Sequence, residues 1–170
     1  RKHNIEDYLE VIKKIKKIKP NIQFSSDFII GYPGETNEDF QETVKLMKEI
    51  RFINSYSYIF SARPGTPAFN LPAGDKEDAK KRLINFQTIA EKIKNEYRKN
   101  LINKISIVLF ENKIENKNKY FGRDEYFNSV IVESDVSLIG KIKSVKITNI
   151  SGNTLFGKII LNSNEKNYAA

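Results

Sequence analysis

The stretch SSDFIIGYPGET, residues 25–36, decides the fold of this chain. Its consecutive apolar residues, Phe28 to Ile30, are typical of a strand that is buried on both faces of a sheet. In the turn that follows, Pro33 fixes φ and Gly34 accepts a positive φ, as a tight turn requires. Thr36 and Asp39 then have the spacing of a capping box. The stretch therefore predicts a strand, a tight turn and the start of a helix.

The neighbouring segments continue this alternation of helices and strands. Asn4 is a suitable N-cap for a helix that ends before Pro20, and apolar residues from Phe40 to Ile50 recur at helical spacing. Residues 56–61 predict a second strand. Short connections in the order α–β–α–β favour a parallel sheet covered by helices, here over residues 1–75. Two strands make no stable parallel sheet alone, so we expect further strands upstream of Arg1.

The second half of the chain changes its hydrophobic period. Asp75 precedes a predicted long helix of about 26 residues, roughly 40 Å, which would connect two domains over residues 76–103. From residue 104 to 161, apolar residues alternate with polar ones, and turn-forming residues separate five short strands. This pattern predicts a small antiparallel β-barrel. The tail, residues 162–170, is predicted to be disordered.

Composition narrows the classes of function. The 170 residues carry a net charge of +8, which favours a polyanionic partner such as nucleic acid. A lysine-rich composition spread along the chain would give the same charge, so the net charge alone does not establish binding to nucleic acid. No apolar run approaches the roughly 18 residues that span a membrane, so we expect no membrane partner. With no cysteine, the chain offers no thiolate for a disulfide, a metal ion or an iron–sulfur cluster, and a cytoplasmic location is expected.

Two turns hold the candidate binding residues of the first half. The turn after residue 30 follows a predicted parallel strand, at the end where α/β barrels bind their ligands. Gly31 and Gly34 would let the backbone approach a ligand, although an ordinary strand–helix turn has the same pattern. Arg63 precedes Pro64 at the end of the second strand, which suits recognition of phosphate or carboxylate, or a surface salt bridge.

The predicted barrel carries candidate RNA contacts. Aromatic residues alternate with charges around Arg123, and such side chains stack on unpaired bases or pack in a core. Lys141 and Lys143 would share one strand face, opposite Ile142. Lys146 would join that face only if a β-bulge lies at Ser144.

Three blocks of sequence together resemble the methylthiotransferase branch of the radical-SAM enzymes: residues 26–36, residues 38–40 and the segment SARPGTPA, residues 61–68. Residues 104–160 resemble the TRAM domain of that family, including the Gly122-Arg123 pair and the closing residues 155–157. The resemblance implies the end of an α/β partial TIM-type barrel, followed by a small β-barrel that binds RNA. It also implies S-adenosylmethionine and two [4Fe-4S] clusters as cofactors, with the cluster cysteines upstream, so this chain would be inactive alone.

The resemblance also implies cofactor-binding residues. The backbone of Ile30 and Gly31 would lie beside the adenosine of the cofactor, with Pro33 and Gly34 next to it. Glu35 falls one position later than the glutamate of the common pattern, so the backbone is the stronger candidate for this contact. Arg1 matches an arginine near the cofactor. No residue is assigned a catalytic role.

Several functions agree with this resemblance. The favoured one is methylthiolation of isopentenyladenosine beside the tRNA anticodon. Other branches of the family act on threonylcarbamoyladenosine in tRNA or on an aspartate of a ribosomal protein. A non-catalytic RNA-binding module is the alternative of a different class, and a Cys-x₃-Cys-x₂-Cys motif upstream would exclude it.

Overall fold

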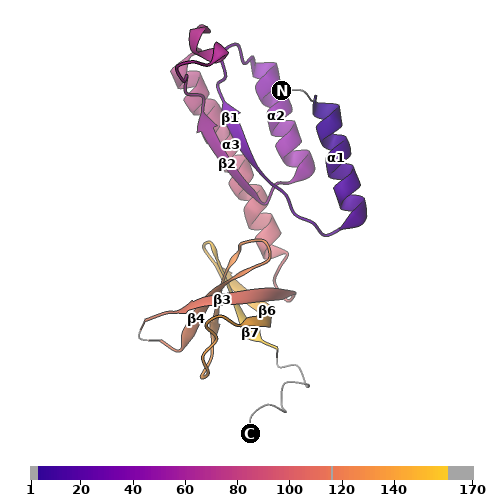
Figure 1. Ribbon diagram of the computed structural model, residues 1–170, viewed down its shortest axis with the longest axis vertical. Helices are drawn as coiled ribbons and strands as arrows, with labels where there is room; N and C mark the ends of the chain where they lie inside the picture. Colours follow the sequence, from indigo (N-terminus) through magenta and orange to yellow (C-terminus); the bar gives the residue numbers. More distant parts are fainter. Residues whose placement is uncertain (1–3, 116, 161–170) are drawn as a thin grey trace. The chain divides into compact units, whose positions relative to one another are not determined.

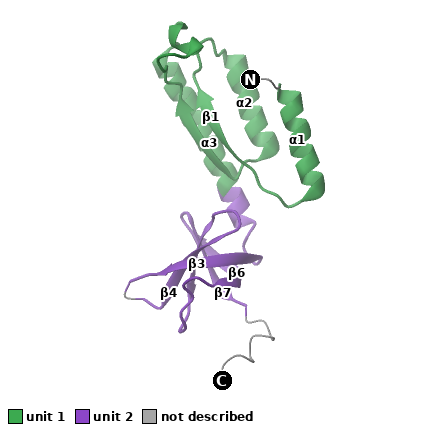
Figure 2. Ribbon diagram, viewed as in Figure 1, with its two compact units in different colours: residues 1–94 green, residues 95–170 purple. Residues whose placement is uncertain are grey.

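A computed structural model describes residues 4–115 and 117–160 (Figure 1). The chain divides into two compact units, residues 1–94 and 95–170 (Figure 2). The boundary falls inside the long helix α3, Lys76–Lys99. Arg1, predicted to bind the cofactor, and the tail predicted to be disordered lie outside the described residues. Every helix of the described ranges is too short or too polar to cross a membrane.

Unit 1 has the predicted order of helices and strands. Before α3 it contains α1 (Ile5–Ile18), β1 (Ser25–Ile30), α2 (Asn37–Ile50), β2 (Asn54–Ile59) and a 3₁₀ turn, η1 (Pro67–Asn70). Strands β1 and β2 are parallel, with pairs running from Ser25–Asn54 to Ile30–Ile59. The parallel sheet predicted from the α–β–α–β order is therefore confirmed.

The helices of unit 1 begin where the capping residues predict. In α1, the side chain of Asn4 accepts from Asp7 N at 2.9 Å, and the Asp7 carboxylate accepts from Asn4 N at 3.2 Å. Thr36 and Asp39 make the same reciprocal pair at the start of α2, at 3.1 and 2.9 Å. Each box satisfies backbone N–H groups that have no partner inside the helix.

One face of the β1–β2 sheet is covered and the other is open. The buried residues of all three helices join Phe28 and Ile30 in one hydrophobic core. Between them, Ile29 is 57% exposed, and its neighbours across the sheet, Tyr56 and Tyr58, are exposed too. The prediction of a strand buried on both faces is wrong for this chain, because successive side chains point to opposite faces and the helices cover only one.

Strand β2 begins two residues earlier than predicted. Phe52 and Ile53 are buried directly after α2, and Ile53 N donates to Phe24 O at 3.0 Å. This bond aligns the two chain segments, so that pairing starts at Asn54 and ends at Ile59. The tertiary contact with the segment before β1, rather than the local pattern, sets the strand boundary.

Unit 2 is a closed five-stranded barrel, as predicted, with the order β3-β4-β5-β7-β6. The strands are β3 (Ile105–Lys113), β4 (Lys119–Asp124), β5 (Ser129–Glu133), β6 (Ile142–Ser151) and β7 (Thr154–Ile159). Four neighbouring pairs are antiparallel, but β5 and β7 are parallel. The barrel is thus mixed rather than purely antiparallel. The reason is that β6 pairs with β3. Strand β7, which follows β6, then lies beside β5 and runs in the same direction as β5.

Candidate functional site

A cavity of about 590 Å³ lies in unit 1 at the carboxyl ends of both strands. Its walls come from the loop after β1, the segment after β2, the η1 region and the first turns of α3. Its lining residues include Gly31, Tyr32, Gly34, Glu35, Phe60, Asp75, Ala79 and Arg82. This is the end of a parallel sheet at which α/β proteins bind ligands.

The loop after β1 is the predicted tight turn. Glu35 N donates to Tyr32 O at 2.8 Å, and Gly34 has a φ of 85°. Gly31 also has a positive φ, 74°, and a Cβ at this position would lie 2.7 Å from the Cβ of Ala79. Glycine is therefore required at position 31 by its backbone conformation and by its packing against α3.

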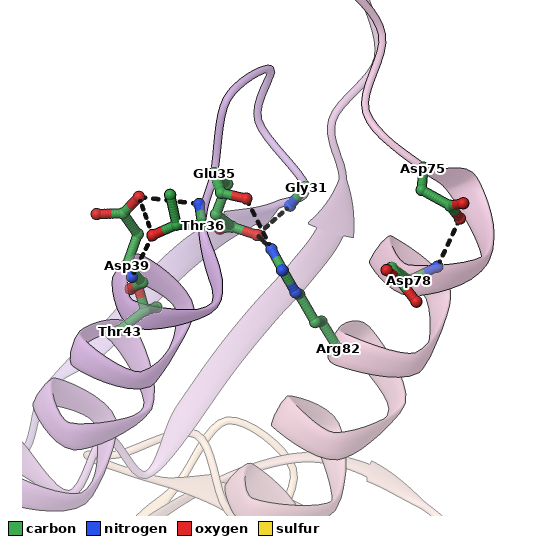
Figure 3. A network of polar contacts seen from close by, with 8 residues as sticks. All are labelled: Gly31, Glu35, Thr36, Asp39, Thr43, Asp75, Asp78 and Arg82. Atoms are coloured by element: carbon green, nitrogen blue, oxygen red, sulfur yellow. Dashed lines mark hydrogen bonds and ion pairs between the residues drawn. The ribbon is translucent and has the colours of Figure 1, made fainter.

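The carboxylate of Glu35 folds back onto the loop that carries it (Figure 3). Its Oε2 accepts from Gly31 N at 2.9 Å and from Arg82 Nη1 at 3.0 Å. The same Nη1 donates to the backbone oxygen of Glu35, also at 3.0 Å. The two side chains are 10% and 21% exposed, so this ion pair is largely shielded from water. Glu35 thus fixes the loop, and this is the role that its observed contacts support.

Arg82 was not among the residues singled out from the sequence. It comes from α3, three residues after Ala79 and four before the fully buried Phe86. Its guanidinium carbon lies 5.8 Å from the centre of the Phe40 ring, within the range of a cation–π contact. A basic residue inside the apolar stripe of α3 is the sequence signal that could have identified it.

Two acidic side chains of unit 1, Asp75 at the cavity and Asp39 outside it, cap helices. The Asp75 carboxylate accepts from the backbone N–H groups of Asp78 and Glu77, which lower its pKa. Hydrogen bonds from the backbone and side chain of Thr36 likewise lower the pKa of Asp39 at the start of α2. Within the described ranges, no His, Cys, Asp and Glu side chains are grouped to hold a metal ion.

The cavity offers surfaces for binding a flat ligand. The rings of Tyr32 and Phe60 line it and meet edge to face, with their centres 5.0 Å apart. Among the described residues, no heavy atom lies within 4 Å of the position that a Cβ of residue 34 would take, so the backbone of Gly34 is open. An aromatic wall beside exposed backbone suits a planar ring with polar edges.

Of the other residues predicted for unit 1, one lines the cavity, one is exposed and one is buried. Pro33 lines the cavity with its neighbours, whereas Arg63 is exposed and is not among the lining residues. The backbone oxygen of Arg63 accepts from the hydroxyl of Thr66 at 2.8 Å. Ile30 is fully buried, and its backbone oxygen accepts from Phe60 N at 2.8 Å. That oxygen serves to hold β1 against the segment after β2.

The register of β6 separates the predicted lysines of unit 2. Pairs run without interruption from Ile105–Lys146 to Leu109–Ile142, so there is no bulge at Ser144. The irregularity lies between Ile147 and Asn149 instead. Lys146 is exposed on the outer face, whereas Lys143 has the parity of the buried Val145. The condition for a shared face of Lys141, Lys143 and Lys146 is therefore not met.

The last predicted RNA contact, Arg123, lies next to the β4–β5 turn. Arg123 is exposed on β4, 3.5 Å from the Glu111 carboxylate and 5.8 Å from the Phe121 ring centre. Asp124 is buried, and its carboxylate accepts from the backbone N–H groups of Tyr126 and Asn128 and from the Asn128 side chain, at 2.8 to 2.9 Å. This carboxylate holds the turn together.

Comparison with known proteins gives consistent matches. Residues 1–47 match the model of the radical SAM superfamily. The tRNA-2-methylthio-N(6)-dimethylallyladenosine synthase of Pelagibacter ubique is 50% identical over 98% of this chain and 37% of the relative. The proteins of the same name from Wolbachia pipientis wMel and Ruthia magnifica are 39% and 40% identical over 92% and 94% of the chain. The chain spans just over a third of the length of these relatives.

Proposed function

Since the chain belongs to the radical-SAM methylthiotransferase family, we propose that it is the C-terminal part of an enzyme that methylthiolates isopentenyladenosine beside the tRNA anticodon. The observation that carries this proposal is the 50% identity with a synthase of that name over 98% of the chain. The matched region includes both units, and so both the loop at the cavity and the barrel. The names of the relatives favour this substrate over threonylcarbamoyladenosine and over a ribosomal-protein aspartate.

The cavity of unit 1 fits the adenosine part of S-adenosylmethionine. Its volume, about 590 Å³, is within the usual range for small-molecule sites. The aromatic pair Tyr32 and Phe60 would contact the adenine, and the open backbone around Gly34 would contact its polar edge. Glu35 and Arg82 would hold the loop in the conformation that accepts the ligand. When bound, this cofactor supplies the radical on which the family's chemistry depends.

The iron–sulfur clusters do not fit this chain. It has no cysteine, and iron–sulfur clusters are held by thiolates. We infer that any cluster ligands belong to sequence outside these residues, so the chain contributes binding surfaces rather than the redox centre. Purified with iron and sulfide in the absence of oxygen, this chain should develop no cluster absorbance and should cleave no S-adenosylmethionine.

tRNA is the proposed partner, with the exposed cations as its contacts. Among the predicted residues, Arg123 and Lys146 lie on the outer face of the barrel, and Lys141 is exposed at its rim. The exposed Arg63 and Lys143, which is half-buried on β6, complete the proposed set. These residues would bind phosphate groups, while base recognition would belong to the catalytic pocket.

The test is methylthiolation by the longer protein that this proposal requires. That protein, reconstituted without oxygen, is given tRNA that carries isopentenyladenosine, tRNA that carries threonylcarbamoyladenosine, and ribosomal protein, in separate reactions. Mass spectrometry of the products should find a methylthio group only on isopentenyladenosine. Modification of either other substrate would identify a different branch of the family. RNA binding by a longer protein that lacks cluster-binding cysteines would instead support the non-catalytic module.

A further inference from the structure

Two lysines face each other on the outside of the barrel. Lys146 of β6 is the direct cross-strand partner of Lys158 of β7, and both side chains are exposed. Within the described part of the chain, neither lysine has an ion-pair partner. Like charges directly opposite each other destabilise an antiparallel pair. The free barrel therefore carries an unfavourable pair that a bound anion would neutralise.

An apolar row runs across the barrel beside these lysines. Phe121 of β4 pairs with Ile131 of β5, which in turn pairs with Phe156 of β7. All three side chains are partly exposed. Leu155, which precedes Phe156, is fully buried in the barrel core, so Phe156 lies on the outer face. Phe156 and Lys158 thus lie on the same outer face, two residues apart.

A groove joins the two features. A cavity of about 450 Å³ on the barrel surface is lined by Ile131, Phe156 and Thr148, together with Lys119, Glu133 and Lys158. Lys119 is paired with Glu133 at 3.1 Å, which leaves Lys158 as the lysine of the groove without a carboxylate partner in the described part of the chain. Proteins bind single-stranded nucleic acids with aromatic rings next to such ammonium groups: the bases stack on the rings, and the phosphates contact the cations.

We propose that this groove binds a single-stranded segment of RNA. A phosphate lies between the ammonium groups of Lys146 and Lys158, and an unpaired base packs against Phe156 and Ile131. A base-paired helix is a poor ligand, because its bases are stacked on one another and cannot reach the ring. This inference rests on the proposed function, and it names the part of the barrel that contacts the RNA.

The experiment measures RNA binding by the whole 170-residue chain over a range of salt concentrations. The probes are a labelled single-stranded RNA and a fully paired duplex of the same length. Three double variants remove the same charge: Lys146→Ala with Lys158→Ala at the groove, Lys141→Ala with Lys143→Ala at two lysines of the proposed tRNA set, and Lys13→Ala with Lys17→Ala, two exposed lysines of α1, as the matched control. Phe156→Ala tests the base contact, and Phe156→Leu retains an apolar side chain without a ring. Thermal unfolding confirms that each variant is folded.

Removal of Lys146 and Lys158 should lower the salt slope by about 0.7, since the two lysines hold one phosphate and each phosphate contact to single-stranded RNA contributes about 0.7. If the variant and the wild-type chain bind equally at 1 M salt, the variant should bind about fivefold more weakly at 0.1 M salt. The control pair should change the slope little. Phe156→Ala should weaken binding about tenfold with the slope unchanged, and Phe156→Leu should recover only part of that loss.

Charge reversal gives a second readout that a structural role would not produce. Lys158→Glu turns the repulsive pair into an attractive one, so it should raise the melting temperature by roughly 1–4 °C. The same variant should weaken RNA binding at least as much as the double alanine variant. If it lowers stability and affinity together, the lysines serve the fold, and the inference is overturned.

The remaining outcomes separate this inference from the proposed function. If the wild-type chain binds neither RNA, the chain has no RNA contact of its own, and both proposals lose their support in the barrel. If it binds RNA but responds only to the Lys141 and Lys143 variant, the groove is the wrong site and the RNA partner stands. Equal binding of duplex and single strand would also overturn the inference.

Discussion

Arg82 and Glu35 are 47 residues apart in the chain, and their side chains form an ion pair of 3.0 Å at the cavity of unit 1. The ion pair also fixes the loop after β1, because the Glu35 carboxylate accepts a hydrogen bond from Gly31 N. One nitrogen of Arg82 reaches both the carboxylate and the backbone oxygen of Glu35. Helix α3 therefore sets the conformation of a loop that the sequence presents as a self-contained turn.

Replacing Arg82 by methionine should destabilise unit 1. The substitution keeps the apolar stem but leaves the shielded carboxylate of Glu35 without its cation, which costs about 1.5–3 kcal/mol. Urea unfolding measures the loss, and faster hydrogen exchange at Gly31 N should accompany it. Lys81→Met is the matched control, because the Lys81 side chain is 76% exposed in a surface pair with Asp78. Equal effects of the two substitutions would contradict this role for Arg82.

Two glycines of the same loop should respond differently to alanine. Gly34→Ala should cost about 1–2 kcal/mol, because only the positive φ opposes it. Gly31→Ala should cost a further 1–3 kcal/mol or so, because its new methyl group also overlaps Ala79. Adding Ala79→Gly to Gly31→Ala should recover part of that extra loss. Unfolding free energies of these three variants and the wild-type chain are the measurement, and equal losses at the two glycine positions would contradict the role of Ala79.

Unit 2 should lose stability at alkaline pH through Tyr97. Burial, and then the negative charge of Asp124, raise the pKa of Tyr97 to about 12. An unfolded tyrosine ionises near pH 10, so the folded state favours the neutral phenol. The stability that depends on this phenol is full below about pH 10 and decreases as pH rises towards 12. Tyr97→Phe should flatten this decrease, while Tyr56→Phe, at an exposed position, should leave it unchanged.

Phe127 should be a site for a stabilising substitution. It has a φ of 60° in the β4–β5 turn and a side chain that is 75% exposed. A non-glycine residue in this conformation costs about 1–2 kcal/mol, and little burial is lost on removing the ring. Phe127→Gly should therefore raise the melting temperature of the barrel by several degrees. Phe127→Ala removes the ring but keeps the strained backbone, so a similar gain there would refute the explanation.

Much of the fold could be predicted because its signals are local. The capping boxes at Asn4 and Thr36 join residues three apart, and the turn bond from Glu35 to Tyr32 has the same separation. Parallel pairing followed from the order of the elements, and the barrel strands followed from alternating apolar residues. Residues so close in sequence can form these bonds only in a few backbone conformations, so the residue types nearly determine them.

The tertiary structure alone decided the features that join distant residues. The sequence placed Glu35 beside a turn, but only the packing of α3 brought Arg82 to it and Ala79 to Gly31. The sequence showed three lysines near Ile142, but the continuous β3–β6 register placed Lys146 on the outer face, and the β6–β7 pairing set it opposite Lys158. Register and helix packing depend on how many distant side chains fit together at once, and no local pattern contains that information.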